Sequence, residues 1–170
     1  FAGFAANPTD WRGPSGANEQ GTHNLIEFQK RLRRDDLSTT HTIVHPVIDK
    51  ERDAIFAGNP VPLHKVGETA DSIVVRGARL LATLAPFADE SAIYPGRPLP
   101  PDTPAEYALA FTVRLDAPGL LFLCRDSGTR LLPAFDAPFS SRFDEQDAYC
   151  IFDHVEIPKA DVWIDANLEI

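Results

Sequence analysis

The sequence has 170 residues, of which 44% are hydrophobic and 24% charged, and its net charge at pH 7 is −9. This length suits one ordinary domain with a sizeable core, and the composition is typical of a globular protein. The acidic charge argues against nucleic-acid binding, because phosphate contacts need a basic surface. No apolar run approaches the roughly 20 residues that cross a bilayer, and no stretch is typical of a signal peptide, so we expect no membrane association.

The first part of the chain predicts helices and one loop. Residues 1–6 are typical of the end of a helix, and residues 7–17 carry the prolines and glycines of a loop. A helix is expected from about Asn18 to Asp35, with apolar residues at helical spacing and cations in its last turns. We interpret the basic cluster at 30–34 as a solvated helix end, with contact to a cofactor phosphate as the alternative. Because the chain lacks methionine and begins in the middle of a pattern, we expect a domain of a longer protein.

The rest of the sequence predicts short strands. They are expected at 37–44, 63–66, 72–75, 79–84, 91–94, 107–115, 120–124, 148–153, 155–157 and 161–164. Turns are expected at 67–71 and at Gly77, and a proline-rich surface loop at 94–104. Strands do not alternate with helices, so a parallel α/β sheet is not expected. The pattern predicts a mainly β fold, an antiparallel β-barrel or sandwich preceded by one or two helices.

The two cysteines do not form a disulfide framework. Cys124 and Cys150 both lie in apolar runs, so we expect two buried, reduced thiols in core strands. Reduced thiols fit a cytoplasmic location.

The segment from Ser38 to Lys50 combines β-branched residues, hydroxyls and two histidines. In a strand, His41 and His45 would face the same side about 13 Å apart, too far to share an ion with bonds of about 2 Å, so we expect no metal site. From the residues alone, a hydrogen-bonded structural role for His41 is favoured, and a ligand contact in a pocket wall is the alternative. Gly-rich phosphate loops, nucleophile elbows and Cys-x-x-Cys pairs are absent from the sequence.

Two further features admit both a structural and a functional interpretation. Asp144, Glu145, Asp147 and Asp153 are expected to be solvated turn carboxylates with arginine partners such as Arg142, and a carboxylate pair for acid–base chemistry is the alternative. Thr83 closes an apolar strand, where its hydroxyl is expected to cap the strand end or to bond a ligand.

Four motifs in the same order resemble the 4-hydroxyphenylacetate 3-hydroxylase oxygenase family. They are Phe1–Pro8, Thr40–Lys50 with its T-H-x-x-x-(N/H)-P pattern, His64–Thr83 and Arg142–Pro158. This resemblance implies the middle β-barrel of an acyl-CoA dehydrogenase-like fold. Residues 1–36 would then be a helical linking segment, 37–165 the β-barrel domain, and 166–170 the start of a connection to a C-terminal helical domain.

The resemblance also implies an activity. Members of the family take reduced FAD from a separate flavin reductase, react it with O2 to a C4a-hydroperoxyflavin, and hydroxylate a phenol next to its hydroxyl. The full-length enzyme would be a cytoplasmic homotetramer. A halophenol monooxygenase and a 4-hydroxybutanoyl-CoA dehydratase-like flavoprotein are related alternatives. An alternative of another class is a non-catalytic β-barrel that serves binding or assembly.

The same resemblance assigns roles to individual residues. His41 would be the catalytic residue, binding the phenolic hydroxyl. The residues expected to contact FAD are Val47, Ile48, Asp49, Lys50 and Thr83, and those expected to cover the substrate are Gly96 and Arg97. The proline-rich stretch at 95–104 departs from the family pattern, so the exact phenol stays open.

Overall fold

The computed structural model describes residues 1–46, 60–100, 102–127 and 133–170. Its helices are α1 (Ala2–Ala6), α2 (Thr9–Arg12) and α3 (Glu19–Asp35), and short 3-10 turns lie at Ala85–Phe87, Ala105–Tyr107 and Lys159–Asp161. Its strands are β1 (Thr39–Thr42), β2 (His64–Glu68), β3 (Ser72–Thr83), β4 (Glu90–Ile93), β5 (Leu109–Arg114), β6 (Leu120–Cys124), β7 (Asp147–Pro158) and β8 (Val162–Asp165). Within these ranges, no helix is both long and apolar enough to span a membrane.

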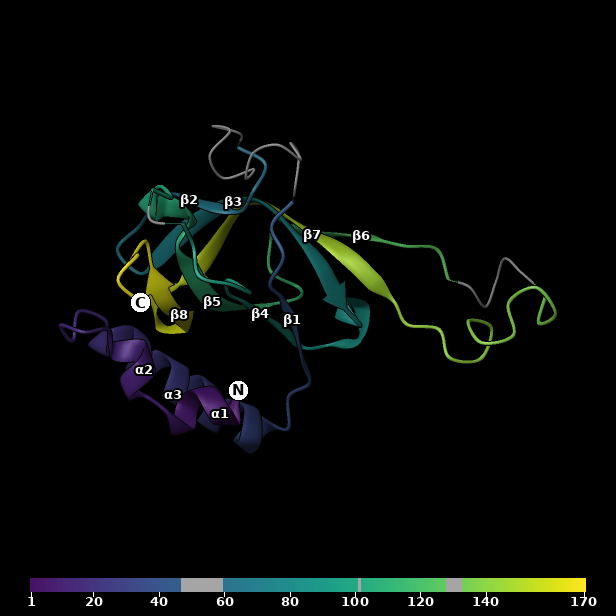
Figure 1. The fold of residues 1–170 in the computed structure, drawn as a ribbon, viewed down its shortest axis with the longest axis horizontal. Coiled ribbons are helices and arrows are strands. Elements are labelled where there is room, and N and C mark those ends of the chain that lie inside the picture. Colours follow the sequence, from purple (N-terminus) through teal and green to yellow (C-terminus); the bar gives the residue numbers. More distant parts are fainter. Residues whose placement is uncertain (47–59, 101, 128–132) are drawn as a thin grey trace.

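The strands form two four-stranded sheets, in the orders β1-β4-β5-β8 and β2-β3-β7-β6. All neighbours are antiparallel except β1 and β4, which pair in parallel with His41 beside Ala92. Figure 1 shows the two sheets above the helical segment. The mainly β fold with preceding helices is therefore confirmed, as two packed sheets over the described residues rather than one closed barrel.

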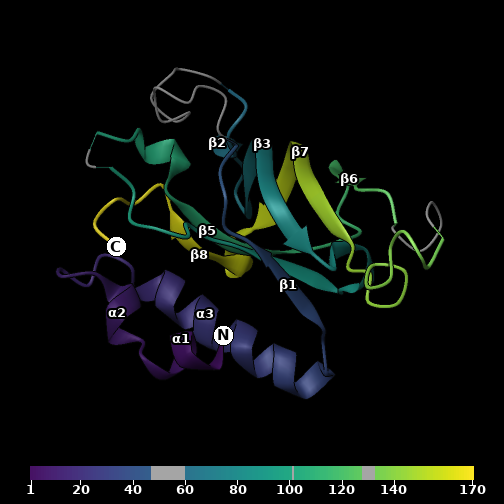
Figure 2. The ribbon, with the colours of Figure 1, turned by 45° about the vertical axis from the view of Figure 1, so that its right-hand side comes forward.

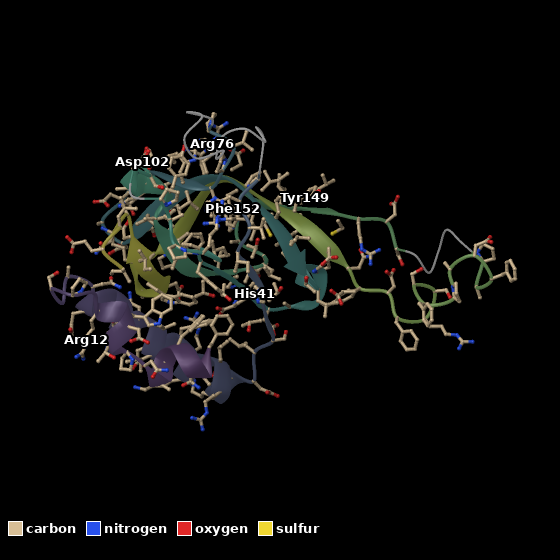
Figure 3. The ribbon with its side chains drawn as sticks, viewed as in Figure 1. Arg12, His41, Arg76, Asp102, Tyr149 and Phe152 are labelled. Atoms are coloured by element: carbon tan, nitrogen blue, oxygen red, sulfur yellow. The ribbon has the colours of Figure 1, made fainter. Side chains whose placement is uncertain are left out.

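The main core lies between the two sheets. Along β7, every second side chain is buried as far as Phe152, which is 2% exposed, whereas Tyr149 is 48% exposed on the outer face (Figure 3). The period of two follows from the pleat of a strand. Phe111 of β5 meets Phe152 edge to face across this core, with ring centroids 6.1 Å apart.

Helix α3 lies on the outer face of the first sheet, against β8 (Figure 2). Its backbone comes so close that a Cβ at Gly21 would lie 2.0 Å from the carbonyl oxygen of Trp163. Two asparagine amides hold this approach: Asn18 Nδ2 donates to the Trp163 carbonyl, and Asn24 Nδ2 to that of Val162, both at 2.8 Å. A second apolar cluster therefore forms outside the first sheet, around Leu25, Phe28 and Trp163.

The basic cluster at 30–34 is not uniformly solvated. Lys30 pairs with Glu27, but Arg31 reaches back to the sheets, where its guanidinium contacts Glu90 Oε2 at 2.9 Å and Asp161 Oδ1 at 2.8 Å. The side chain of Glu90 is only 8% exposed. Arg31 therefore joins α3 to β4 and to the turn before β8.

Two predicted strand breaks are wrong. β3 runs unbroken through Gly77, whose φ of 119° lets the backbone pass so close that a Cβ would lie 2.5 Å from the Pro62 carbonyl oxygen. β7 likewise runs through His154, at a φ of 54°. The two residues lie at the same register shift in the pairing of β3 with β7, and both strands continue through it.

Two local predictions are also wrong. The expected loop at 7–17 contains the short helix α2, with Pro8 at its N-cap, where the missing backbone N–H costs nothing. Cys124, expected to be buried, is exposed on β6, whereas Cys150 on β7 is 1% exposed as expected. Cys124 pairs with Ala148 and Cys150 with Phe122, so the two cysteines share one face of the sheet, with Cys124 at the exposed end of β6. Both are free thiols.

Candidate functional site

His41 lies on the face of the first sheet that the helices cover. The neighbouring Thr40 and Thr42 point the other way and donate to the carbonyls of Thr83 and Leu80, at 2.5 and 2.6 Å. Because side chains alternate along a strand, His41 points away from the main core. It is exposed there, on the edge strand of its sheet (Figure 3).

Tyr94 is the aromatic neighbour of His41. It directly follows β4, and its ring centroid lies 6.0 Å from that of His41, with the planes 36° apart. On its other side Tyr94 meets Phe4 edge to face at 5.5 Å. Burial raises the pKa of the Tyr94 hydroxyl, so the phenol stays protonated and remains able to donate a hydrogen bond.

Tyr94 also lines a pocket of about 560 Å³ on the same face. Phe4, Trp11 and Ile164 supply apolar walls, and Asp10 and Arg97 supply charges of opposite sign. Binding sites for small aromatic molecules commonly combine apolar walls with a few polar groups. His41 does not line this pocket and reaches it only through its contact with Tyr94.

The predicted substrate loop is attached to the strand that carries His41. The backbone N–H of Gly96 donates to the Ile43 carbonyl at 3.2 Å. A Cβ at Gly96 would lie 3.1 Å from the Ile43 side chain, so the loop fits tightly at this point. Gly96 and Arg97 both line the pocket, and the structure therefore brings them to the same face as His41.

Thr83 ends β3 next to β1, and its hydroxyl has a defined partner. Thr83 Oγ1 donates to Asp147 Oδ1 at 2.9 Å, across the register pair formed by the last residue of β3 and the first of β7. Thr40 Oγ1 donates to the Thr83 carbonyl, which ties Thr83 to the strand of His41. The strand-end role expected for Thr83 is thus present, and its exposed hydroxyl oxygen keeps further acceptor capacity.

The backbone around Thr83 is unusual. Leu81 and Leu84 adopt left-handed conformations with φ of 61° and 57°, and the pairing register of β3 with β7 shifts between Arg79 and Ala82. A left-handed residue other than glycine costs about 1–2 kcal/mol. Such irregularities concentrate where a side chain must be aimed for function.

A buried basic cluster lies behind β1. Arg79 of β3 is fully buried, and its Nη1 donates to the Ile43 carbonyl at 3.5 Å. Its Nε and Nη2, and both ring nitrogens of His45, have no hydrogen-bond partner within the described ranges. Burial, together with the charges of Arg79 and Arg97, lowers the pKa of His45 to about 3, and burial lowers that of Arg79 to about 9. His45 is therefore neutral at pH 7.

The acidic run is paired, but not with the expected arginine. Arg125 contacts Asp144 Oδ1 at 2.5 Å and lies 3.9 Å from Asp147 Oδ2. Asp144 is only 8% exposed, so the prediction of a solvated carboxylate paired with Arg142 is wrong for this residue. Asp153 is solvated, with His154 Nδ1 at 2.9 Å.

The predicted site residues are thus only partly brought together. His41, Gly96 and Arg97 share one face, and Thr83 lies behind the same edge strand. Val47, Ile48, Asp49 and Lys50 lie outside the described residues. Sequence reasoning missed Tyr94 and Arg79. A tyrosine at the start of a proline-rich loop and an arginine inside an apolar run were the available signals.

Comparison with known proteins places these features in a family. A model of the family described as "4-hydroxyphenylacetate 3-hydroxylase N terminal" matches residues 1–164. The chain belongs to the 4-hydroxyphenylacetate 3-hydroxylase family. The predicted resemblance is therefore confirmed over almost the whole chain.

The relatives of this hydroxylase family are much longer than the chain. It is 39% identical over 148 residues to a 4-hydroxyphenylacetate 3-monooxygenase oxygenase component of Thermus thermophilus, covering 86% of this chain and 30% of that protein. It is 34% identical over 167 residues to a 4-nitrophenol 2-monooxygenase oxygenase component of Rhodococcus, covering 96% and 30%. The chain thus spans about a third of the length of the relatives it matches.

Solved structures agree with the family assignment. The oxygenase component of 4-hydroxyphenylacetate 3-monooxygenase, complexed with FAD and 4-hydroxyphenylacetate, superposes with a TM-score of 0.80 at 37% identity, covering 98% of this chain and 33% of that chain. An archaeal 4-hydroxybutyryl-CoA dehydratase from N. maritimus superposes with a TM-score of 0.82 at 17% identity, over 98% of this chain and 33% of that chain. The second likeness shows the fold alone.

Proposed function

We propose that this chain is part of a flavin-dependent aromatic monooxygenase that hydroxylates a phenol ortho to its hydroxyl, with reduced FAD and O2. The family match over residues 1–164 is the observation that carries the proposal. One oxygen atom of O2 enters the ring, the other leaves as water, and reduced FAD supplies the two electrons. Halophenol monooxygenases, the related alternative, use the same chemistry. Because the proline-rich loop departs from the family pattern, the identity of the phenol is not assigned.

His41 is the proposed catalytic residue. Its ring is exposed beside Tyr94, and within the described residues no hydrogen bond holds its nitrogens. A neutral imidazole accepts the proton of a phenol, which raises electron density at the ortho carbon. The exposed ring of His41 and its aromatic neighbour therefore support a role in binding the hydroxyl of a phenol.

Substrate binding is assigned to the side of the site next to His41. Gly96 and Arg97 would cover the phenol, with the hydrogen bond from Gly96 to Ile43 holding the loop to the His41 strand. The aromatic and apolar walls of the adjoining pocket suit a phenolic ring.

The flavin side is assigned to Thr83 and to Val47, Ile48, Asp49 and Lys50. FAD, when bound, supplies the electrons that activate O2. Thr83 fits such a cofactor, because its exposed hydroxyl oxygen still accepts a hydrogen bond after donating to Asp147. The irregular backbone on both sides of Thr83 supports the same assignment.

The proposal extends to partners and location. Reduced FAD would come from a separate flavin reductase, since the relatives are named as oxygenase components. A cytoplasmic site of action is supported by the two free thiols. In the full-length protein, 1–36 would link a helical domain to the β domain at 37–165, and 166–170 would lead to a second helical domain.

We also propose a homotetramer for the full-length protein. Figure 1 shows residues 133–146 extending away from the sheets beyond β6 and β7. This segment exposes Phe135, Phe139 and Phe143 at 91%, 78% and 76%. Exposed apolar side chains in such numbers are typical of subunit or domain interfaces.

Product analysis of the full-length protein tests the activity. The protein is mixed with chemically reduced FAD, O2 and a panel of phenols that includes halogenated, nitro and carboxymethyl derivatives. We expect at least one phenol to give an ortho-dihydroxy product that incorporates one atom of ¹⁸O2. If the flavin is oxidised and hydrogen peroxide is released while every phenol in the panel stays unchanged, the proposed function is contradicted.

A further inference from the structure

We propose that Asp147 is a positioning residue that makes the Thr83 hydroxyl an obligate hydrogen-bond acceptor toward the flavin, and so makes the site prefer reduced over oxidised FAD. The inference rests on the proposed function, because it takes Thr83 to face the flavin ring. It goes further by assigning a redox preference to a residue that the family resemblance left without a role.

The first step is the direction of one hydrogen bond. An ionised carboxylate only accepts hydrogen bonds, so the 2.9 Å contact between Thr83 Oγ1 and Asp147 Oδ1 uses the single proton of the hydroxyl. The second carboxylate oxygen of Asp147 lies 3.9 Å from Arg125 Nε. The remaining capacity of Thr83 Oγ1 is then two lone pairs.

The second step is that the backbone holds the pair in place. Thr83 and Asp147 are register partners at the ends of β3 and β7, and Leu84 N donates to the Gln146 carbonyl at 2.7 Å just beyond them. The Thr83 carbonyl is itself bonded by Thr40. The backbone therefore holds the two side chains opposite each other before a ligand arrives.

The third step is the chemistry of the ligand. N5 of a reduced flavin carries a hydrogen and donates, whereas N5 of an oxidised flavin only accepts. An oxygen that offers only lone pairs bonds the first and leaves the second unpaired. A net hydrogen bond contributes about 0.5–1.5 kcal/mol, which corresponds to a preference of about 2- to 12-fold.

An alternative role would be purely structural, with the Thr83–Asp147 bond joining two strand ends. The two roles differ in what they predict for Asp147→Asn and Asp147→Ala. Both substitutions remove the charge, but only asparagine keeps an oxygen that accepts the Thr83 proton. A structural role would change both affinities for FAD together and leave their ratio unchanged.

The experiment uses the full-length protein and anaerobic titrations that give Kd for oxidised and for reduced FAD. The ratio of the two constants is compared in wild type, Asp147→Asn, Asp147→Ala, Thr83→Val, and both Asp147 variants in the Thr83→Val background. Asp153→Ala is the matched control, because Asp153 lies on the same strand and its carboxylate bonds only His154 among the described residues.

We expect Asp147→Asn to favour reduced FAD about 2- to 12-fold more strongly than Asp147→Ala does. In the Thr83→Val background the two Asp147 variants should have the same ratio, and Asp153→Ala should match wild type. Equal ratios for Asp147→Asn and Asp147→Ala, in a protein that binds FAD, would overturn the inference alone. A wild-type protein that binds FAD in neither state would overturn the proposed function as well.

Discussion

At the scale of single residues, the local sequence predicts the direction of the His41 side chain but not the exposure of the face on which it lies. Alternation along a strand predicts that Thr40 and Thr42 share one face and His41 the other, as the structure shows. The spacing does not tell which face is open. That depends on Tyr94, which directly follows β4 and lies more than fifty residues later in the sequence. The residues alone therefore favoured a structural histidine.

The ion-pair partners of charged residues were also not predictable from the sequence. Asp144 and Asp147 lie close to Arg142 in sequence, but the structure brings Arg125, the residue directly after β6, to them instead. Strand pairing sets these contacts, and no local spacing encodes which two strands pair. The family resemblance assigned a role to Thr83 but not to Asp147, because only the pairing of β3 with β7 brings the two residues together.

His45 leads to a prediction about pH. Its pKa is lowered from 6.5 to about 3, chiefly by burial and further by Arg79 and Arg97. Between these values the unfolded chain binds a proton at this side chain and the folded chain does not, so stability is fully present above pH 6.5 and falls as the pH falls. We expect a loss of about 1–2 kcal/mol between pH 7 and pH 5 from this residue.

Urea unfolding at pH 7 and pH 5 measures the contribution of His45. His45→Asn should remove that part of the pH dependence, because an amide does not titrate. His23→Gln, a change at an exposed position of α3, should leave the pH dependence as in wild type. The same loss of stability on acidification in His45→Asn and wild type would contradict the lowered pKa.

At the scale of elements, strand texture predicted most of the fold. β6 was placed to the residue, and α3 to within one residue of its start. The failures lie at Gly77, which was interpreted as a turn, and at His154, where two strands were expected instead of one. Whether a glycine ends a strand or lets it pass another segment depends on Pro62, which packs there only in the folded chain.

Arg31 is predicted to hold the helical segment onto the sheets. Arg31→Met leaves the nearly buried Glu90 with a hydroxyl partner, Thr112, but without a cation. We expect a loss of about 1–3 kcal/mol in the free energy of unfolding, less than for a fully buried pair because Arg31 is 32% exposed.

Lys30→Met is the control for Arg31, since the Lys30–Glu27 pair is exposed and solvent screens it. Adding Glu90→Gln to Arg31→Met should restore part of the stability, because the uncompensated carboxylate is then gone. Chemical unfolding measures the free energy of unfolding of wild type, Arg31→Met, Lys30→Met and the double variant with Glu90→Gln. Equal losses for Arg31→Met and Lys30→Met would show that the bridge does not hold the helix.

At the scale of the whole molecule, composition and strand count predicted the fold class, and four ordered motifs predicted the family. The parallel pairing of β1 with β4 was not predictable, because it joins residues that are 51 positions apart in the sequence, such as Thr39 and Glu90. That pairing places His41 near Tyr94 and the pocket. The flavin-binding segment at 47–50 lies outside the described residues and stays a prediction.

The central claim is that His41 faces the substrate in a flavin-dependent phenol monooxygenase. Its most direct test is the hydroxylation rate of full-length His41→Ala, measured with the best phenol and saturating reduced FAD, alongside Kd for reduced FAD. His23→Ala, at an exposed position on α3, is the control. We predict a rate about 10²-fold or more lower in His41→Ala, the range of general acid–base catalysis, with Kd for FAD within about 2-fold of wild type. Unchanged hydroxylation in His41→Ala, or a loss of FAD binding equal to the loss of rate, would contradict the claim.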